Sequence, residues 1–191
     1  MFIQQFALKS WVQKQLCHLQ FAIDFAKTHP TREMQMIAFR ETMEYVSEHM
    51  RGAAAVCSSK EILDLALAAA TIDGEFLEFG VFSGGTLNYM AKRRPDLVFH
   101  GFDSFEGLPE GWIGGGTTWR KGAFDRKGRP PRVRRNVRIH KGIFADTLPR
   151  WKEDHSGRVA FLHIDSDLYS SAKCVFDHLA DRIAPGTVIL F

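Results

Sequence analysis

Residues 75–86 constrain the fold of this chain more than any other segment. They begin with a short apolar strand, 75–80, and continue into a glycine-rich turn, so that Gly80, Gly84 and Gly85 lie at the strand end and in the turn. Glycine allows a tight turn and lets the backbone lie against a ligand where a Cβ would collide. A helix that begins at such a turn leaves unpaired N–H groups beside that ligand. The segment therefore predicts a strand, a ligand-binding turn and a helix in direct succession.

Glu78 lies next to this turn and restricts the kind of ligand that the turn can bind. A carboxylate is a poor neighbour for a phosphate because like charges repel, whereas a positively charged or hydroxyl-rich ligand is compatible with it. We therefore expect a nucleoside cofactor without a phosphate chain, and S-adenosylmethionine fits that description. A nicotinamide-dependent oxidoreductase is an alternative on a similar sheet, but its pyrophosphate would lie beside Glu78.

The composition points to one ordinary globular core. The chain has 191 residues, of which 45% are hydrophobic, and its 25 basic and 22 acidic residues give a net charge of only +3. Basic residues do gather in 126–138, but without the aromatic or motif context of a nucleic-acid site. We interpret that segment as a solvated loop and expect no nucleic-acid partner.

The cysteines and the apolar runs bear on where the protein acts. The three cysteines lie far apart and form no metal-ligand spacing, which is typical of buried thiols in a reducing compartment: Cys17, Cys57 and Cys174. The N-terminus lacks the pattern of a secretory signal, and no apolar run is long enough to cross a bilayer. We therefore expect a cytoplasmic protein without a membrane partner.

Two regions follow from the hydrophobic periodicity. Residues 1–70 show helical spacing, with helices expected over 1–29, 31–50 and 59–70, and form an N-terminal helical extension. Their apolar stripes are compatible with core packing or with the interface of a homodimer. Residues 71–191 alternate short strands with helices, which predicts a Rossmann-like α/β domain with a parallel sheet and helices on both faces.

The expected elements of this second region are short. Strands are predicted at 75–80, 97–102, 137–141, 159–165 and 186–191, and helices at 84–93, 145–152 and 169–182. The segment 106–135 is rich in Gly, Pro and Arg and has no apolar period. Such a loop usually forms a lid or lacks fixed structure.

The second strand ends in Asp103, about twenty residues after the glycine turn. An acidic residue at that place is positioned to accept hydrogen bonds from both ribose hydroxyls of a nucleoside. The alternative is an Asx-turn or an N-cap. After the third strand, Gly142 permits close approach of a ligand, and Phe144 is expected either to pack on a heterocycle or to belong to the core.

The fourth strand ends in Asp165-Ser-Asp167. Strand alternation places both carboxylates on one side of the carboxyl edge, where a divalent cation such as Mg²⁺ would relieve their repulsion. Methyl transfer to an alcohol needs the hydroxyl proton removed, which a metal and a nearby carboxylate promote. The alternative is an N-cap pair for the following helix. We expect the preceding His163 to be structural.

Four segments together resemble the macrocin-type O-methyltransferases, class I S-adenosylmethionine enzymes known from macrolide and aminocoumarin biosynthesis. The segments are 77–86, 101–109, 146–149 and 162–169, and the resemblance covers about residues 31–191. It implies that Glu78, Gly80 and Asp103 hold the cofactor, that Asp165 is a magnesium ligand and that Asp167 is the general base. Members of the family continue into an acidic pair and two further strands, so we expect the C-terminal strands of the fold to be absent here.

The predicted function is a Mg²⁺-dependent O-methyltransferase that acts on a hydroxyl of a small molecule, either a sugar or another natural product. The alternative is a cofactor-binding or scaffold protein of the same fold with impaired catalysis. The predicted cofactor site comprises Glu78, Gly80, Ser83, Gly84, Gly85, Asp103, Ser104, Gly142 and Phe144.

Overall fold

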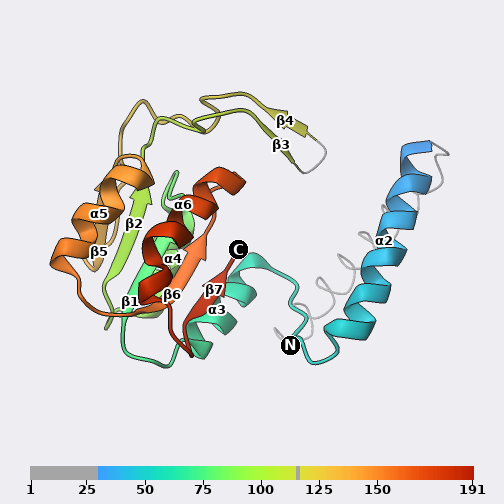
Figure 1. Ribbon diagram of the computed structural model, residues 1–191, viewed down its shortest axis with the longest axis horizontal. Coiled ribbons are helices and arrows are strands. Elements are labelled where there is room, and N and C mark those ends of the chain that lie inside the picture. The colour runs from blue at the N-terminus through green and yellow to red at the C-terminus, as the bar shows by residue number, and fades with distance from the viewer. Residues whose placement is uncertain (1–29, 115–116) are drawn as a thin grey trace, which may run out of the picture. The chain divides into compact units, whose positions relative to one another are not determined.

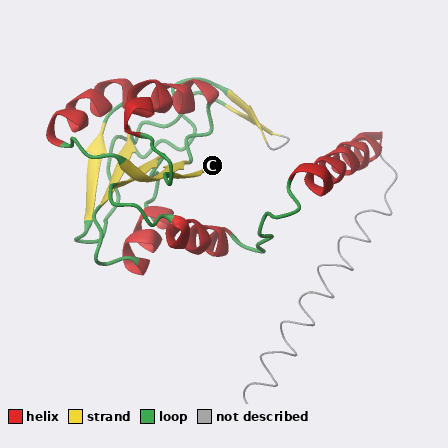
Figure 2. Cartoon of the chain, turned by 60° about the horizontal axis from the view of Figure 1, so that its bottom comes forward, coloured by secondary structure: helices red, strands yellow, loops and turns green. Residues whose placement is uncertain are grey.

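The computed structural model describes residues 30–114 and 117–191 (Figures 1 and 2). The chain divides into two compact units between Ala55 and Val56. In the described part of the first unit, helix α2 (Pro30–His49) agrees with the helix predicted over 31–50. The helix predicted over 1–29 lies outside the described residues. None of the described helices is long and apolar enough to cross a membrane.

A five-stranded parallel sheet forms the centre of the second unit. Its strands are β1 (Glu75–Phe79), β2 (Phe99–Asp103), β5 (Val137–Lys141), β6 (Val159–Ile164) and β7 (Val188–Leu190), in the spatial order β5-β2-β1-β6-β7. The sequence predicted all five strands, with boundaries that differ by a few residues. The strand order reverses between β1 and β6, and ligands bind at such a switch point in open α/β sheets.

Two helices cover each face of this sheet (Figure 1). Helices α3 (Ser59–Ala69) and α4 (Gly85–Arg93) lie on one face, and α5 (Phe144–Asp154) and α6 (Tyr169–Leu179) lie on the other, where a short 3₁₀ turn follows α6. Strand alternation divides the core accordingly: Phe76 packs on the α3/α4 side, and Leu77 and Phe79 pack on the α5/α6 side. The predicted Rossmann-like fold is therefore confirmed.

Helix α3 belongs to the α/β unit, so the boundary between the two units precedes this helix. The sequence suggested a boundary at residue 70 instead. Leu63 and Leu67 of this helix are buried in the core on one face of the sheet. The helix begins at Ser58, whose hydroxyl accepts a hydrogen bond from the Glu61 backbone N–H, while the Glu61 carboxylate accepts one from the backbone N–H of Cys57. These two hydrogen bonds resemble a capping box, and they fix the position at which α3 begins.

The described part of the segment 106–135 has a defined path, although its sequence shows no apolar period. Its described part includes two short antiparallel strands, β3 (Trp112–Gly114) and β4 (Thr117–Trp119), which the sequence analysis did not predict. Backbone hydrogen bonds from Arg126 and Gly128 to the carbonyl of Phe105 return the loop to the end of β2. The loop is therefore held by backbone polar groups, which hydrophobic periodicity does not report.

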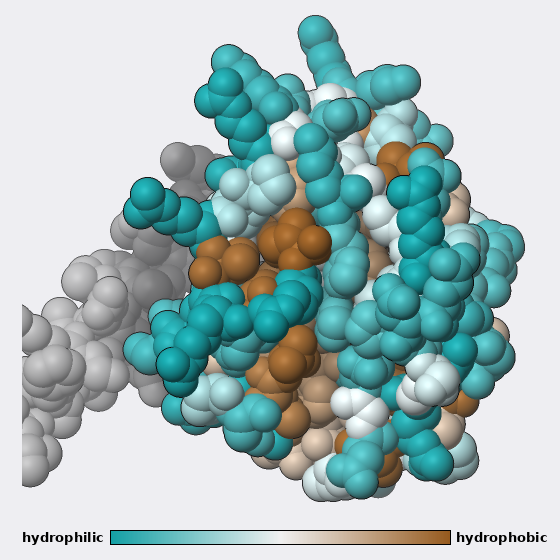
Figure 3. All heavy atoms as spheres, turned by 90° about the vertical axis from the view of Figure 1, so that its left-hand side faces the viewer, coloured by the Kyte–Doolittle hydropathy of each residue, from teal (hydrophilic) through white to brown (hydrophobic). Residues whose placement is uncertain are grey.

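The edge of the sheet at β5 is covered by charged groups. Figure 3 faces the side of the molecule that carries β5 and α5, and hydrophilic residues cover most of it. Arg138 of β5 donates hydrogen bonds to the carbonyls of Arg135 and Val137, so that part of the basic segment is tied to the backbone. Charged side chains on an edge strand discourage pairing with another sheet.

Candidate functional site

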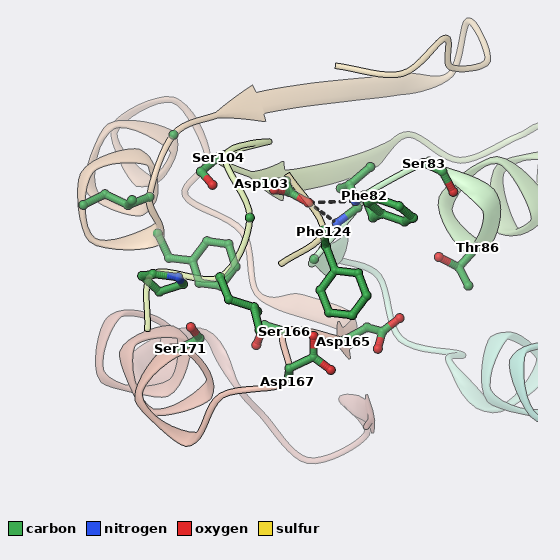
Figure 4. A pocket seen from close by; sticks show the side chains of 18 of the residues that line it. Phe82, Ser83, Thr86, Asp103, Ser104, Phe124, Asp165, Ser166, Asp167 and Ser171 are labelled. Carbon is green, nitrogen blue, oxygen red and sulfur yellow. Dashed lines mark hydrogen bonds between the residues drawn. The ribbon is translucent and has the colours of Figure 1, made fainter. Parts of the chain in front are cut away.

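A cavity of about 400 Å³ lies at the carboxyl ends of β1, β2 and β6 (Figure 4). It opens at the place where the strand order reverses, as expected for a ligand site of this fold. Four backbone segments form most of its wall: the turn after β1, the end of β2, the entry to α5 and the loop after β6. The predicted site residues on this wall are Gly80, Ser83, Gly85, Asp103, Ser104, Gly142, Phe144, Asp165 and Asp167.

The three glycines of the turn after β1 have different physical roles. Gly80 has a φ of +92°, and a Cβ on it would lie 1.9 Å from the carbonyl oxygen of Asp165. Gly84, the N-cap of α4, has a φ of +77° and lies beneath Pro131, away from the pocket wall. Beside Gly85 the space is open, since a Cβ there would meet only the Ser83 hydroxyl, at 4.0 Å. Only Gly85 thus leaves room for a ligand, while Gly80 permits contact between two backbone segments.

Asp103 holds the turn in place through three hydrogen bonds. Its Oδ2 accepts from the backbone N–H groups of Val81 at 2.8 Å and Phe82 at 2.7 Å, and its Oδ1 accepts from Phe105 at 2.7 Å (Figure 4). The bond to Phe105 is the Asx-turn that the sequence analysis named as the alternative role. A carboxylate has about four lone-pair sites. Asp103 thus retains capacity for roughly one further donor, fewer than the two ribose hydroxyls that the prediction assigned to it.

Glu78 lies beneath the turn and does not belong to the described pocket wall, contrary to the expected orientation toward the ligand. Its side chain is fully buried, and its Oε1 accepts a 2.5 Å hydrogen bond from the hydroxyl of Thr86. Its Oε2 lies 3.9 Å from Nδ1 of His163, and neither atom has a hydrogen-bond partner within the described residues. Burial raises the pKa of Glu78, and His163 and Thr86 partly offset this effect.

The entry to α5 contributes a tight turn and an aromatic ring. Gly142 has a φ of +144°, and its N–H donates to the carbonyl of Asp103, so the two predicted residues are directly linked. Phe144 packs edge-on against Phe79, with ring centroids 5.1 Å apart, and also lines the pocket. Phe144 therefore belongs to the edge of the core and also lines the pocket, and its packing on a heterocycle remains a prediction.

Asp165 and Asp167 project from the loop after β6 on the same wall of the pocket (Figure 4). Asp167 has a φ of +61°, a left-handed conformation that is strained for a residue with a Cβ. Burial raises the pKa of Asp167, and the nearby charge of Asp165 raises it further. The N-cap of α6 is Leu168, without a side-chain capping bond, so the structure does not support the alternative that these aspartates cap the helix.

The pair offers the oxygen ligands that Mg²⁺ prefers. Ser166, between the two aspartates, has a buried hydroxyl for which the described residues provide no hydrogen-bond partner. In the described ranges, a cluster of three side chains with metal-ligand geometry occurs only at Glu75, His100 and His155, at the other end of the strands. The pocket therefore provides two carboxylates for a metal, and Asp165 as a magnesium ligand remains a prediction.

Two phenylalanines at the pocket were not identified from the sequence. Phe82 and Phe124 meet edge-on with ring centroids 5.8 Å apart, and the guanidinium of Arg126 lies 5.8 Å from the centroid of Phe82 (Figure 4 shows the two rings). Both rings are partly exposed, at 46% and 37%. The sequence did contain a signal for both. Phe82 lies inside a glycine-rich turn and Phe124 inside a polar loop, where packing in the core does not account for an aromatic residue.

Comparisons with known proteins agree with this geometry. Residues 77–191 match the family described as a methyltransferase domain. The chain is 31% identical over 148 residues, 62% of its length, to the 8-demethyl-8-(2,3-dimethoxy-alpha-L-rhamnosyl)-tetracenomycin-C 4'-O-methyltransferase of Streptomyces olivaceus. It spans about half the length of that relative, 52%.

Solved structures show the same fold. A crystal structure of the calicheamicin methyltransferase CalS11 superposes with a TM-score of 0.59 at 20% identity, covering 86% of this chain and 78% of the other. An apo structure of CalS11, described as a TDP-rhamnose 3'-O-methyltransferase, gives a TM-score of 0.52 at 19% identity over 86% and 79% of the two chains. These likenesses agree with the resemblance found in the sequence, and the match over 77–191 covers more than half of the chain: it belongs to the methyltransferase-domain family.

Proposed function

We propose that this protein is an S-adenosylmethionine-dependent O-methyltransferase that acts on a hydroxyl of a small molecule. The observation that carries the proposal is the pocket at the strand switch point, where the glycine turn and Asp103 face Asp165 and Asp167 across one cavity. A cavity of about 400 Å³ is within the range of small-molecule and cofactor sites. The named relative and the CalS11 structures are O-methyltransferases or methyltransferases by description, which supports the same class.

The cofactor would be held by the half of the pocket that β1 and β2 provide. The remaining lone pair of Asp103 can accept from a ribose hydroxyl, and the open space beside Gly85 admits a ligand atom where any other residue would place a Cβ. Phe144 offers a ring at the opposite wall for contact with a flat heterocycle. Glu78, Gly80 and Gly84 would act indirectly, by fixing the turn.

The acceptor would be activated by the half of the pocket that β6 provides. An acceptor oxygen loses its proton as it bonds to the methyl carbon, so a carboxylate at that oxygen assists the step. Asp167 is the proposed general base, because its raised pKa makes it a stronger proton acceptor than an ordinary aspartate. Mg²⁺, when bound by Asp165, would supply Lewis-acid stabilisation of the alkoxide.

The proposed acceptor class is a sugar or another natural product with a free hydroxyl. The Streptomyces relative is named for methylation of a rhamnosyl group, and one CalS11 structure is described by its activity on TDP-rhamnose. The exposed rings of Phe82 and Phe124, with Arg126 next to them, form an amphipathic wall at the pocket. Aromatic rings of this kind pack on the apolar faces of ring-shaped ligands.

Calorimetric titration with S-adenosylhomocysteine tests the cofactor half. We expect binding to the unmodified chain and its loss in Gly85→Val. The valine side chain would fill the open space beside residue 85, and Gly85 has no left-handed φ that valine would strain. Gly52→Val is the matched control, because its Cβ also meets nothing within 4 Å, outside the pocket. If the unmodified chain bound NADH and not S-adenosylhomocysteine, the proposal would fail in favour of the oxidoreductase alternative.

Methyl transfer from S-adenosylmethionine to a panel of hydroxylated sugars tests the catalytic half, with and without Mg²⁺. Turnover that requires Mg²⁺ and is lost in Asp167→Asn is the expected result. Binding of S-adenosylhomocysteine without turnover of any acceptor would favour the scaffold alternative. The homodimer is a separate prediction, for which light scattering after size-exclusion chromatography gives the mass in solution.

A further inference from the structure

The three-residue cluster of Glu75, His100 and His155 lies at the end of the sheet remote from the pocket. Glu75 begins β1, His100 is the second residue of β2, and His155 directly follows α5. The pocket lies at the opposite, carboxyl ends of β1 and β2. One potential ligand atom from each of the three residues lies within 4.8 Å of the other two. This cluster is therefore independent of the site described above.

The two imidazoles differ in the way they are held. Nδ1 of His155 lies 2.7 Å from the carbonyl oxygen of Trp151, which can only accept a hydrogen bond. The proton of neutral His155 is therefore on Nδ1, and the lone pair of Nε2 is free for a ligand. Metal-binding histidines commonly have this arrangement, in which the second nitrogen donates to a carbonyl and fixes the ring. The ring of His155 also stacks on Trp151, with centroids 4.6 Å apart.

His100 is buried, and its ring contacts Glu75 of the cluster as well as His140 of β5. Its Nε2 lies 3.4 Å from Oε2 of Glu75, and its Nδ1 lies 2.9 Å from Nε2 of His140. The relative exposure of this residue is 5%.

From this geometry we propose that Glu75, His100 and His155 form a structural zinc site that joins the starts of β1 and β2 to the end of α5. Tetrahedral bonds of about 2.1 Å place neighbouring ligand atoms about 3.4 Å apart, which equals the separation between Glu75 and His100. The third ligand needs its distances to the other two to shorten by up to about 1.4 Å from the observed limit of 4.8 Å. Two imidazoles and one carboxylate favour Zn²⁺ over Mg²⁺.

Binding would require His100 to carry its proton on Nδ1, with His140 as the acceptor. In this structure Nε1–H of Trp151 donates a hydrogen bond to Nδ1 of His100 at 3.2 Å. Zinc binding would therefore break this bond, move the His100 proton from Nε2 to Nδ1, and make His140 a positioning residue for the ligand. Glu75 is half-buried, with a side-chain exposure of 27%, which provides a route for the ion from solvent.

Titration of the chelator-treated chain with Zn²⁺ in excess Mg²⁺ tests the proposal. We expect one Zn²⁺ per chain and an affinity at least about a hundredfold lower in His155→Gln. His49→Gln is the control, because His49 lies 3.7 Å from Glu48 and forms no three-ligand group with other described residues, so the substitution should leave zinc affinity unchanged. Glu75→Gln gives an independent test, because the amide retains the size of the side chain and weakens the ligand.

Cobalt provides a readout that does not depend on stability or activity. Co²⁺ in the wild-type protein should show the intense visible absorption of a tetrahedral site, and His155→Gln should lose it. Absence of stoichiometric Zn²⁺ binding to the unmodified chain would overturn the proposal. Equal affinities of wild type, His155→Gln and Glu75→Gln would do the same, since any bound zinc would then lie elsewhere.

Discussion

The carboxylates that line the two halves of the pocket differ in how completely they are hydrogen-bonded. In the half formed by β1 and β2, the carboxylate of Asp103 accepts three backbone hydrogen bonds. In the half formed by the loop after β6, Asp167 has a left-handed backbone and a raised pKa, and the hydroxyl of Ser166 has no partner within the described residues. Strain and unsatisfied groups concentrate where a site acts on a ligand. The first half should therefore stabilise the fold, while the second should cost stability.

The largest effect is expected for Gly80→Ala, where the two halves touch. The new Cβ would collide with the Asp165 carbonyl at 1.9 Å, and the φ of +92° is unfavourable for alanine. We expect a loss of more than about 4 kcal/mol in the free energy of unfolding, or failure to fold. Gly122→Ala separates the steric clash from the backbone strain. Gly122 also has a positive φ, +81°, but a Cβ on it would have no atom within 4 Å. The cost of Gly122→Ala should be about 1–2 kcal/mol, measured by urea unfolding, and equal losses in both variants would contradict the steric argument.

The next largest effect is expected for Asp103→Ala, which removes the carboxylate that accepts three backbone hydrogen bonds. Hydrogen bonds to charged groups contribute about 1.5–3 kcal/mol each, but water can replace part of them at this open site. We therefore expect a loss of about 2–4 kcal/mol together with loss of S-adenosylhomocysteine binding. In the control, Asp125→Ala, only a local bond from the Lys127 N–H is lost, and the change should be below about 1 kcal/mol. Similar values for the two variants would mean that the Asp103 bonds do not hold the turn.

An effect of opposite sign is expected for Asp167→Asn. The substitution removes a charge that is disfavoured first by partial burial and then by repulsion from Asp165, so the free energy of unfolding should rise by about a few tenths of a kcal/mol, since solvent screens much of the effect. Methyl transfer should fall by about 10²–10⁴-fold. Asp177→Asn is the control on the same unit, because it removes an exposed ion pair with Lys173 and should change activity little. If Asp167→Asn lowered the free energy of unfolding, both halves of the pocket would stabilise the fold, and the proposed difference between them would be wrong.

The smallest effect is the pH dependence of that stability difference. The pKa of Asp167 is raised in the folded protein, so its contribution to stability is present at low pH and is lost as the pH rises through the folded pKa. The gain in Asp167→Asn should accordingly be absent well below the ordinary aspartate pKa of about 3.9 and reach its full size at neutral pH. Urea unfolding of both proteins at several values between about pH 3 and pH 7 measures it. If the stability gain of Asp167→Asn grew toward low pH, the pKa of Asp167 would be lowered in the folded protein and not raised.

The strands and the place of the pocket could be predicted because they follow from local patterns. Alternation of short apolar strands and helices specified the sheet, and the carboxyl ends of its strands specified where Asp103, Asp165 and Asp167 meet. The glycine turn was recognisable because its residues are consecutive. These features depend on periodicity and on chain order alone.

The features that could not be predicted depend on side-chain and loop contacts or on elements too short to show a pattern. Glu78 turns beneath the loop because its carboxylate accepts a hydrogen bond from the hydroxyl of Thr86 there and lies 3.9 Å from His163. Phe124 reaches Phe82 only because the loop after β2 returns to the backbone carbonyl of Phe105. The strands β3 and β4 are three residues each, too short for an alternating pattern to appear.

The hydrogen bonds of Asp103 also bear on the order in which the chain folds. All of their partners lie between Val81 and Phe105, so this half of the pocket closes over a short stretch of sequence. Contacts of low sequence separation form early, because little loop entropy is lost on closure. By contrast, the approach of Gly80 to Asp165 must wait for β6. During synthesis the turn after β1 can therefore take its final shape before the residues that face it across the cavity have left the ribosome.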